Sequence, residues 1–288
     1  MPDLWGLAAI ATKFFLYLGV LASGGLILCR LVLADQMSAF DRAARIWAIG
    51  FATLAVAMAA LGFAVRGAVL MDDVSGMVDP SILALLWQTP PGEALLFRLL
   101  GLGTLVLGAA IGGRWLWVAA VGGAVAIWSF CEIGHVASQD RLWFQSVLFA
   151  HLIAAAFWIG IFLPLSRLSR SADTLGDAAA LGHRFGQIAS VAVPLLVVAG
   201  AIMTWRLVGS VSALFGTGYG LSLLAKLSAV ALLLALAALN KVRLVPALQR
   251  GDPGVGPQLS QSISLEWLCV GVILFATAIF TSVLTVPT

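Results

Sequence analysis

Residues 142–165 read LWFQSVLFAHLIAAAFWIGIFLPL, an apolar run that contains no Asp, Glu, Lys or Arg. A helix of about 20 apolar residues is long enough to cross the hydrocarbon core of a bilayer. The run carries a single ionisable side chain, His151, near its middle. This stretch therefore predicts a membrane-spanning helix with one polar group close to the bilayer midplane.

The whole chain shares this apolar character. Of its 288 residues, 61% are hydrophobic and 10% are charged, whereas about a quarter of a soluble domain is charged. This composition excludes an ordinary soluble enzyme, a disordered chain and a nucleic-acid-binding domain. We predict an all-α polytopic membrane protein with a single transmembrane domain, residues 1–288. The three cysteines lie far apart in sequence, so we expect no disulfide framework.

Apolar runs bounded by charges or turn residues predict eight transmembrane helices. They cover residues 5–33, 46–70, 92–111, 115–134, 142–165, 185–208, 219–239 and 265–286. The stretch between the second and third runs is polar and acidic, and Gly112-Gly113-Arg114 predicts a tight turn between the third and fourth.

The Lys and Arg residues of the loops predict the orientation, because cytoplasmic loops are enriched in them. The even connections and both termini carry only Arg141 and Arg206. The odd connections carry Arg30, Arg42, Arg45, Arg114, Arg167, Arg170, Arg184, Lys241, Arg243 and Arg250. The odd loops are therefore expected in the cytoplasm, and both termini in the periplasm of a bacterial inner membrane.

Ionisable groups inside a membrane are costly, so each one is a functional candidate. These are Lys13, Arg66, Arg98, His135, His151 and Lys226. The first three could instead extend towards the interface or pair with acids.

We expect His151 to face the bundle interior, towards the fourth, sixth or seventh span. Trp158 would share its face, with Lys226 and Met203 as candidate neighbours. A neutral imidazole in this position can bind a metal. A core histidine bonded to a carbonyl or hydroxyl group is the alternative interpretation.

A second candidate site lies at the predicted outer end of the fourth span. Cys131 and His135 are four residues apart and would share one helix face, with Glu132 beside them. A thiol with an imidazole suits copper or zinc. Met71 and Met77 lie in the outer second loop, and their thioethers suit Cu(I). The alternatives are an interfacial histidine beside a buried cysteine, and methionines that fill packing gaps.

Several motifs together resemble the CopD family of bacterial copper-resistance membrane proteins, most clearly over residues 134–288. They are Gly134-His135, His151-x6-Trp158-x-Gly160, Arg184-Phe185, Thr217-x-Tyr219-Gly220, Lys226, Asn240-x3-Leu244-x-Pro246 and Leu284-Thr285-x-Pro287. The resemblance implies copper uptake or handling at the inner membrane together with the periplasmic copper carrier CopC. Some relatives carry a fused CopC-like domain; these 288 residues contain none, so we expect a separate CopC-type partner.

Copper transport without a catalytic step is therefore the leading functional hypothesis, with Cu(I) as the cargo. Copper would meet soft donors at the outer face and then reach His151. One alternative is a haem-b-type membrane oxidoreductase, since haem is held by buried histidines. His135 and His151 would differ in depth by about 9 Å at 1.5 Å per residue, which disfavours a haem between them. The other alternative is a non-transporting copper-delivery or assembly protein.

Overall fold

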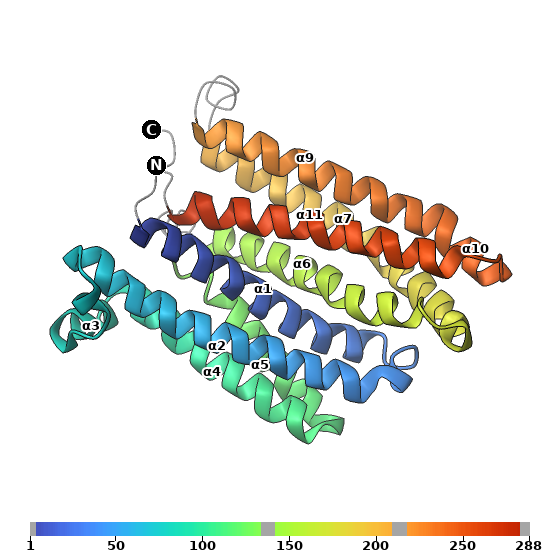
Figure 1. The fold of residues 1–288 in the computed structure, drawn as a ribbon, viewed down its shortest axis with the longest axis horizontal. Helices are drawn as coiled ribbons and strands as arrows, with labels where there is room; N and C mark the ends of the chain where they lie inside the picture. Colours follow the sequence, from blue (N-terminus) through green and yellow to red (C-terminus); the bar gives the residue numbers. More distant parts are fainter. Residues whose placement is uncertain (1–3, 134–141, 209–217, 283–288) are drawn as a thin grey trace.

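The computed structural model describes residues 4–133, 142–208 and 218–282, which form helices and turns without a β-strand (Figure 1). The long helices are α1 (Leu4–Val32), α2 (Asp41–Met71), α4 (Pro90–Ile111), α6 (Leu142–Leu168), α7 (Leu175–Val208), α9 (Gly218–Leu239) and α11 (Val255–Ser282). The shorter elements are η1 (Ser38–Phe40), η2 (Val74–Met77), α3 (Pro80–Trp87), η3 (Gly113–Trp115), α5 (Leu116–Trp128), η5 (Ala172–Thr174), the π-helical η6 (Asn240–Leu244) and α10 (Val245–Arg250).

Seven helices in the described residues are long and apolar enough to cross a membrane. The expected fourth span coincides with a shorter apolar helix, residues 113–128. Helices α7 and α11 begin about ten residues before the predicted spans, because an apolar run marks only the part of a helix inside hydrocarbon. The last predicted residues, 283–286, lie outside the described part of the chain.

The prediction that the fourth helix continues to residue 134 is wrong, because α5 ends at Trp128. The amides of Phe130 and Cys131 bond to carbonyls three residues earlier, at 3.1 and 2.7 Å, so the chain leaves the α-helix through tight turns. The Ser129 hydroxyl donates to the Ala126 carbonyl at 2.6 Å. A serine side chain that bonds the local backbone in this way competes with continued helix.

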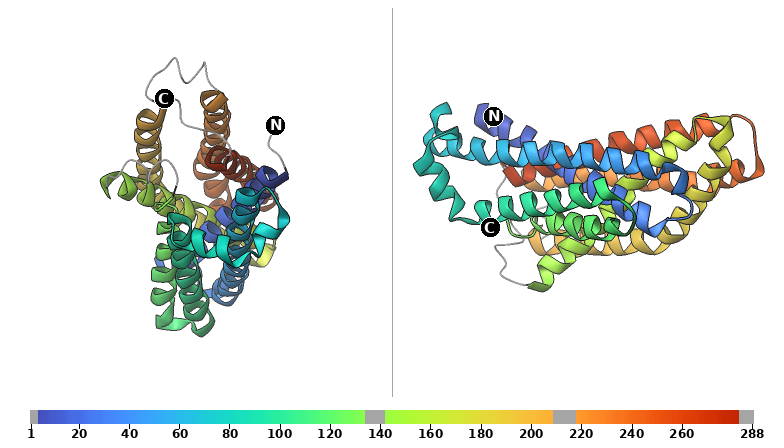
Figure 2. Two further views of the ribbon diagram at one scale, coloured as in Figure 1. Left: turned by 90° about the vertical axis from the view of Figure 1, so that its left-hand side faces the viewer. Right: turned by 90° about the horizontal axis from the view of Figure 1, so that it is seen from below.

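Helix α1 forms the centre of the bundle and contacts α2, α5, α6 and α11 (Figure 1). Of the 18 most apolar consecutive residues of α1, 61% are buried. The corresponding buried share is 0% for α7 and 11% for the region of α9. In the end-on view of Figure 2, α7 and α9 lie at the edge of the bundle, where α7 packs on α6 and α9 packs on α11. The densely packed core therefore lies around α1, and α7 and α9 complete the bundle on one side.

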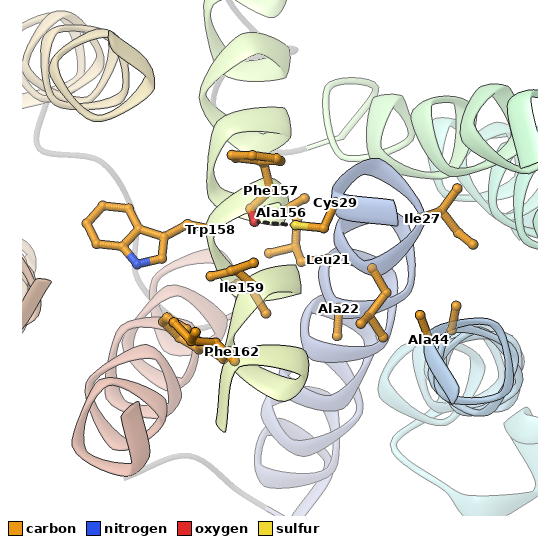
Figure 3. Packing of buried hydrophobic residues seen from close by; sticks show 14 of the residues in the cluster. Leu21, Ala22, Ile27, Cys29, Ala44, Ala156, Phe157, Trp158, Ile159 and Phe162 are labelled. Atoms are coloured by element: carbon orange, nitrogen blue, oxygen red, sulfur yellow. Dashed lines mark hydrogen bonds between the residues drawn. The ribbon is translucent and has the colours of Figure 1, made fainter. Parts of the chain in front are cut away.

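Two glycines allow α1 and α6 to cross in backbone contact. A Cβ atom on Gly25 would lie 1.9 Å from the Ala156 carbonyl oxygen, and one on Gly160 would lie 2.2 Å from Gly25. Near this crossing the Cys29 thiol bonds the Phe157 carbonyl at 3.1 Å (Figure 3). The close approach fixes the position of α6, the helix that carries both His151 and Trp158.

The two ends of the bundle differ in how their charges are paired. At one end Asp41 accepts from Arg30 at 2.6 Å and from Arg45 at 3.0 Å, and Arg45 also caps α4 through the Ala109 carbonyl. The first residue of α1, the last described residues of α11 and helix α3 all lie at the opposite end (Figures 1 and 2). The Lys/Arg pattern predicts that this opposite end faces the periplasm.

The acidic second loop is folded rather than extended. Asp79 begins α3 as its N-cap and accepts from the amides of Ser81 and Ile82 at 2.9 and 3.0 Å. Asp73 precedes η2, and hydrogen bonds from the side chain and amide of Ser75 lower the pKa of its carboxyl group. These turns hold the loop against the end of α2.

Candidate functional site

A large cavity lies between the α1 core and helices α7 and α9, with a volume of about 1120 Å³. Helices α1, α2, α4, α6, α7, α9 and α11 all contribute to its wall. Most of the lining is apolar, and its ionisable or sulfur-bearing side chains are Lys13, Tyr17, Met58, Arg66, Arg98, His151, Met203 and Lys226. Every intramembrane ionisable candidate predicted from sequence thus lines this one cavity, except His135, which lies outside the described residues.

His151 enters the cavity from α6, about 13 Å along the helix axis from its first residue. Its Nδ1 atom lies 3.0 Å from the Leu196 carbonyl oxygen of α7. A Cβ atom on Gly200 would lie 3.6 Å from Cε1, so the ring packs against α7 at this glycine. The expectation that His151 faces the bundle interior, towards the sixth span, is confirmed.

The bond to Leu196 selects one tautomer of His151. A carbonyl oxygen only accepts hydrogen bonds, so Nδ1 carries a proton. In the neutral imidazole, which the apolar setting favours over the charged form, Nε2 then keeps its lone pair. Metal-binding histidines commonly donate their other ring N–H to a backbone carbonyl in this way. The imidazole is therefore held in the form that can bind a metal through Nε2.

Met203 and Lys226 line the same cavity as His151, as expected from their positions in α7 and α9. Lys226 is near enough for its charge to act on the imidazole. The cavity thus combines a soft thioether and a neutral imidazole with a cation that opposes a second positive charge.

Trp158 connects the cavity to a buried carboxyl group. It lines the cavity wall, and its Nε1 donates to Glu266 Oε2 on α11 at 3.3 Å. The Asn240 amide donates to the other carboxyl oxygen of Glu266, and Asn240 begins the π-helical segment η6. Glu266 is only 3% exposed. Trp158 points away from the α1–α6 contact in Figure 3.

Glu266 was missed by reasoning from the sequence. It lies at the start of the apolar run 265–286, so the sequence pattern predicts that Glu266 lies at the membrane boundary. Because α11 begins at Val255, Glu266 instead lies about 16 Å from the start of its helix. The polar residues from Gln258 to Ser264 were the available signal, since neither Gly nor Pro interrupts them, and Pro257 before them is tolerated in the first turn of a helix.

The predicted outer site is only partly described. His135 lies outside the described residues, and Cys131 lies in the turn after α5, so the helix on which the prediction placed Cys131 ends before it. Cys131 is buried, with its thiol 3.5 Å from the Gln145 carbonyl oxygen, and Glu132 accepts from the Trp128 indole.

The methionines are not brought into the cavity together. Met71 ends α2 and is exposed, and Met77 lies in η2 and is half-buried; neither lines the cavity that holds Met203. Within the described residues, no group of three or more His, Cys, Asp or Glu side chains is arranged to hold a metal ion.

The remaining cations form a group on the opposite wall. Lys13, Arg66 and Arg98 come from α1, α2 and α4, and their charges act on one another. The alternative that these cations pair with acids does not occur among the described residues, where the ion pairs are Arg30–Asp41, Arg45–Asp41 and Arg250–Asp252.

A bundle of long apolar helices around a cavity with buried cations, an imidazole and a thioether defines a multi-pass membrane protein. Two family models match the chain: Copper resistance protein D-like, N-terminal domain, over residues 1–145, and Copper resistance protein D over residues 178–280. The chain belongs to the copper resistance protein D (CopD) family. No curated protein and no solved structure matches it significantly.

Membership confirms the resemblance inferred from the motifs and extends it to the N-terminal half, where few motifs were apparent. It makes the protein a membrane protein of copper resistance or handling. The single-domain organisation stays a prediction.

Proposed function

We propose that the protein carries copper across the bacterial inner membrane, receiving it at the periplasmic end of the bundle. Family membership supports a role in copper handling. The observation that carries the proposal is the contact of His151 Nδ1 with the Leu196 carbonyl oxygen. This contact leaves the lone pair of Nε2 free to bind a metal in the cavity wall. Met203 adds a soft donor to the same wall, which supports Cu(I) as the cargo.

The proposed direction of entry rests on the predicted orientation of the bundle. The paired arginines Arg30 and Arg45 lie at the end predicted to be cytoplasmic, and the cavity residues lie towards the other end. Copper would enter from the periplasm, delivered by a separate carrier of the CopC type. Met71, Met77, Cys131 and His135 are proposed as outer contacts on this route.

A buried polar group lies beyond the cavity on the cytoplasmic side. Trp158 follows His151 by seven residues, about 10 Å further along α6, and contacts Glu266. A continued series of polar side chains supports passage across the membrane over delivery to a periplasmic oxidase. We infer that copper passes from His151 towards Glu266, with Trp158 between them.

The positions of the histidines do not favour the alternative of a haem-binding oxidoreductase. Within the described residues, His151 is the only histidine in the cavity wall, and His183 is exposed on α7. Axial ligation by two buried histidines thus has one described candidate. An absorption spectrum of the purified protein tests it, because bound haem gives a strong Soret band.

Copper accumulation in cells that express His151→Ala tests the proposal, with His183→Ala as the matched control. His183 carries the same side chain but is exposed and bonded to Gln187 at 3.2 Å. We expect His151→Ala to lower accumulation severalfold at equal protein level in the membrane, and His183→Ala to behave as wild type. Wild-type accumulation in His151→Ala would show that His151 is structural.

A further inference from the structure

Three cations share one wall of the cavity near its periplasmic end. Arg98 is only 8% exposed, and Lys13 and Arg66 are half-buried. The charges of Arg66 and Arg98 act on Lys13, and all three side chains line the same cavity. Three like charges so close together in an apolar setting repel one another strongly, because the low dielectric weakens screening.

These cations have only neutral partners among the described residues. Lys13 donates to the Thr281 carbonyl, and Arg98 donates to the Ser129 hydroxyl at 3.1 Å and lies 5.3 Å from the centre of the Phe130 ring. Arg66 makes no hydrogen bond or ion pair with a described residue. Among the described residues, no Asp or Glu lines the cavity.

The cytoplasmic end of the same bundle shows the contrast. There Arg30 and Arg45 share the carboxylate of Asp41, so the protein itself supplies an acid to two half-buried guanidinium groups. At the cavity, the compensating negative charge must come from outside the described residues.

We propose that Lys13, Arg66 and Arg98 form a binding site for a phosphate oxyanion. Arginine presents a planar fork of donors that matches phosphate, and lysine adds a compact charge. The Tyr17 hydroxyl, 3.1 Å from Thr281 Oγ1, lies within reach of the same charges and can donate as well. The site does not depend on copper transport.

The wall beside the three cations is apolar, with Ala9, Leu16, Met58 and Phe63 among its residues. This combination fits a phosphate that is attached to an acyl chain, as in the head group of an anionic phospholipid. Free inorganic phosphate presents the same oxygens without the apolar part. Both sources share the chemistry that the cations recognise, and the experiment separates them.

The test measures thermal unfolding of the delipidated full-length protein in a non-ionic detergent. A ligand that binds the folded state raises the unfolding temperature. Short-chain phosphatidylglycerol and inorganic phosphate are titrated separately, with short-chain phosphatidylcholine as the zwitterionic comparison. Lys13→Gln and Arg66→Gln each remove one cation, and Arg243→Gln removes an exposed cation at the far end of the bundle.

We expect phosphatidylglycerol to stabilise the wild type and Arg243→Gln equally. The half-saturating concentration should rise about tenfold in Lys13→Gln and Arg66→Gln, as expected for the loss of one charge-assisted hydrogen bond. A matching response to inorganic phosphate would identify a free anion as sufficient, and a response to the lipid alone would identify the head group. Equal responses in all variants, or no response to either probe, would overturn the site.

Native mass spectrometry provides a test that requires no variant. The wild-type protein in anionic lipid should retain one phospholipid under conditions that strip phosphatidylcholine. If Arg66→Gln does not fold, Arg66→Lys keeps the charge but loses the fork, and it should bind more weakly than the wild type. Release of both lipids under the same conditions would count against the site.

Discussion

The indole nitrogen of Trp158 donates to Glu266 Oε2 at 3.3 Å, which joins the wall of the cavity to a carboxyl group that is almost fully buried. The two residues are far apart in sequence and lie on α6 and α11. Asn240 completes the group from the start of η6, which directly follows α9. The bundle thus holds one polar cluster beyond its cavity, where three helices meet.

Replacing Glu266 by Ala is expected to destabilise the protein by about 2–5 kcal/mol, because the indole and amide N–H groups would lose their acceptor within the bundle. Glu266→Gln keeps one carbonyl oxygen as an acceptor and should cost much less. Thermal unfolding in detergent measures both. Equal losses in the two variants would show that the hydrogen bonds contribute little.

Lys226→Met should raise the affinity of the cavity for copper. Removal of the ammonium charge near His151 relieves its repulsion of a bound cation, which at an effective dielectric near 20 amounts to about 1.4 kcal/mol, or tenfold, for charges about 12 Å apart and to more at shorter range. Isothermal titration with Cu(I) in a competing chelator measures the change. Lys226→Arg keeps the charge and should bind copper as the wild type does, whereas a gain in Lys226→Arg would contradict an electrostatic cause.

Gly160→Val is expected to disrupt the crossing of α1 and α6. The added carbons would overlap the backbone of Gly25, so the helices must separate at a cost of about 3 kcal/mol or more. Gly271→Val is the matched control, because a Cβ atom there meets nothing within 4 Å. The yield of monodisperse protein and its unfolding temperature report the difference. If both variants behave alike, the crossing tolerates separation.

Both termini are predicted to lie in the periplasm. Alkaline phosphatase fused after residue 288 should be active, because this enzyme folds only after export. A fusion after Arg250, in an odd connection, should be inactive. Green fluorescent protein at the same positions should give the opposite pattern. If green fluorescent protein fused at the C-terminus is fluorescent and alkaline phosphatase there is inactive, the cavity end faces the cytoplasm, and the proposed direction of copper entry is reversed.

The outer copper contacts illustrate a limit of local reasoning. A spacing of four residues between Cys131 and His135 indicates a shared face only if the helix continues through both. The helix ends at Trp128, where Ser129 bonds the backbone and also accepts from Arg98 of α4. A residue distant in sequence therefore takes part in the turn that follows α5, and no local pattern could reveal it.

The sequence by itself determined that the protein is a bundle of membrane-spanning helices, because a long apolar run dictates its own helix in lipid. It also identified the costly polar groups, since each stands out against apolar neighbours. Only the tertiary structure decided that Lys13, Arg66, Arg98, His151 and Lys226 surround one cavity and that Trp158 bonds Glu266. Those relationships join helices that are distant in sequence, and close packing at contacts such as Gly25 with Gly160 sets which helix faces meet.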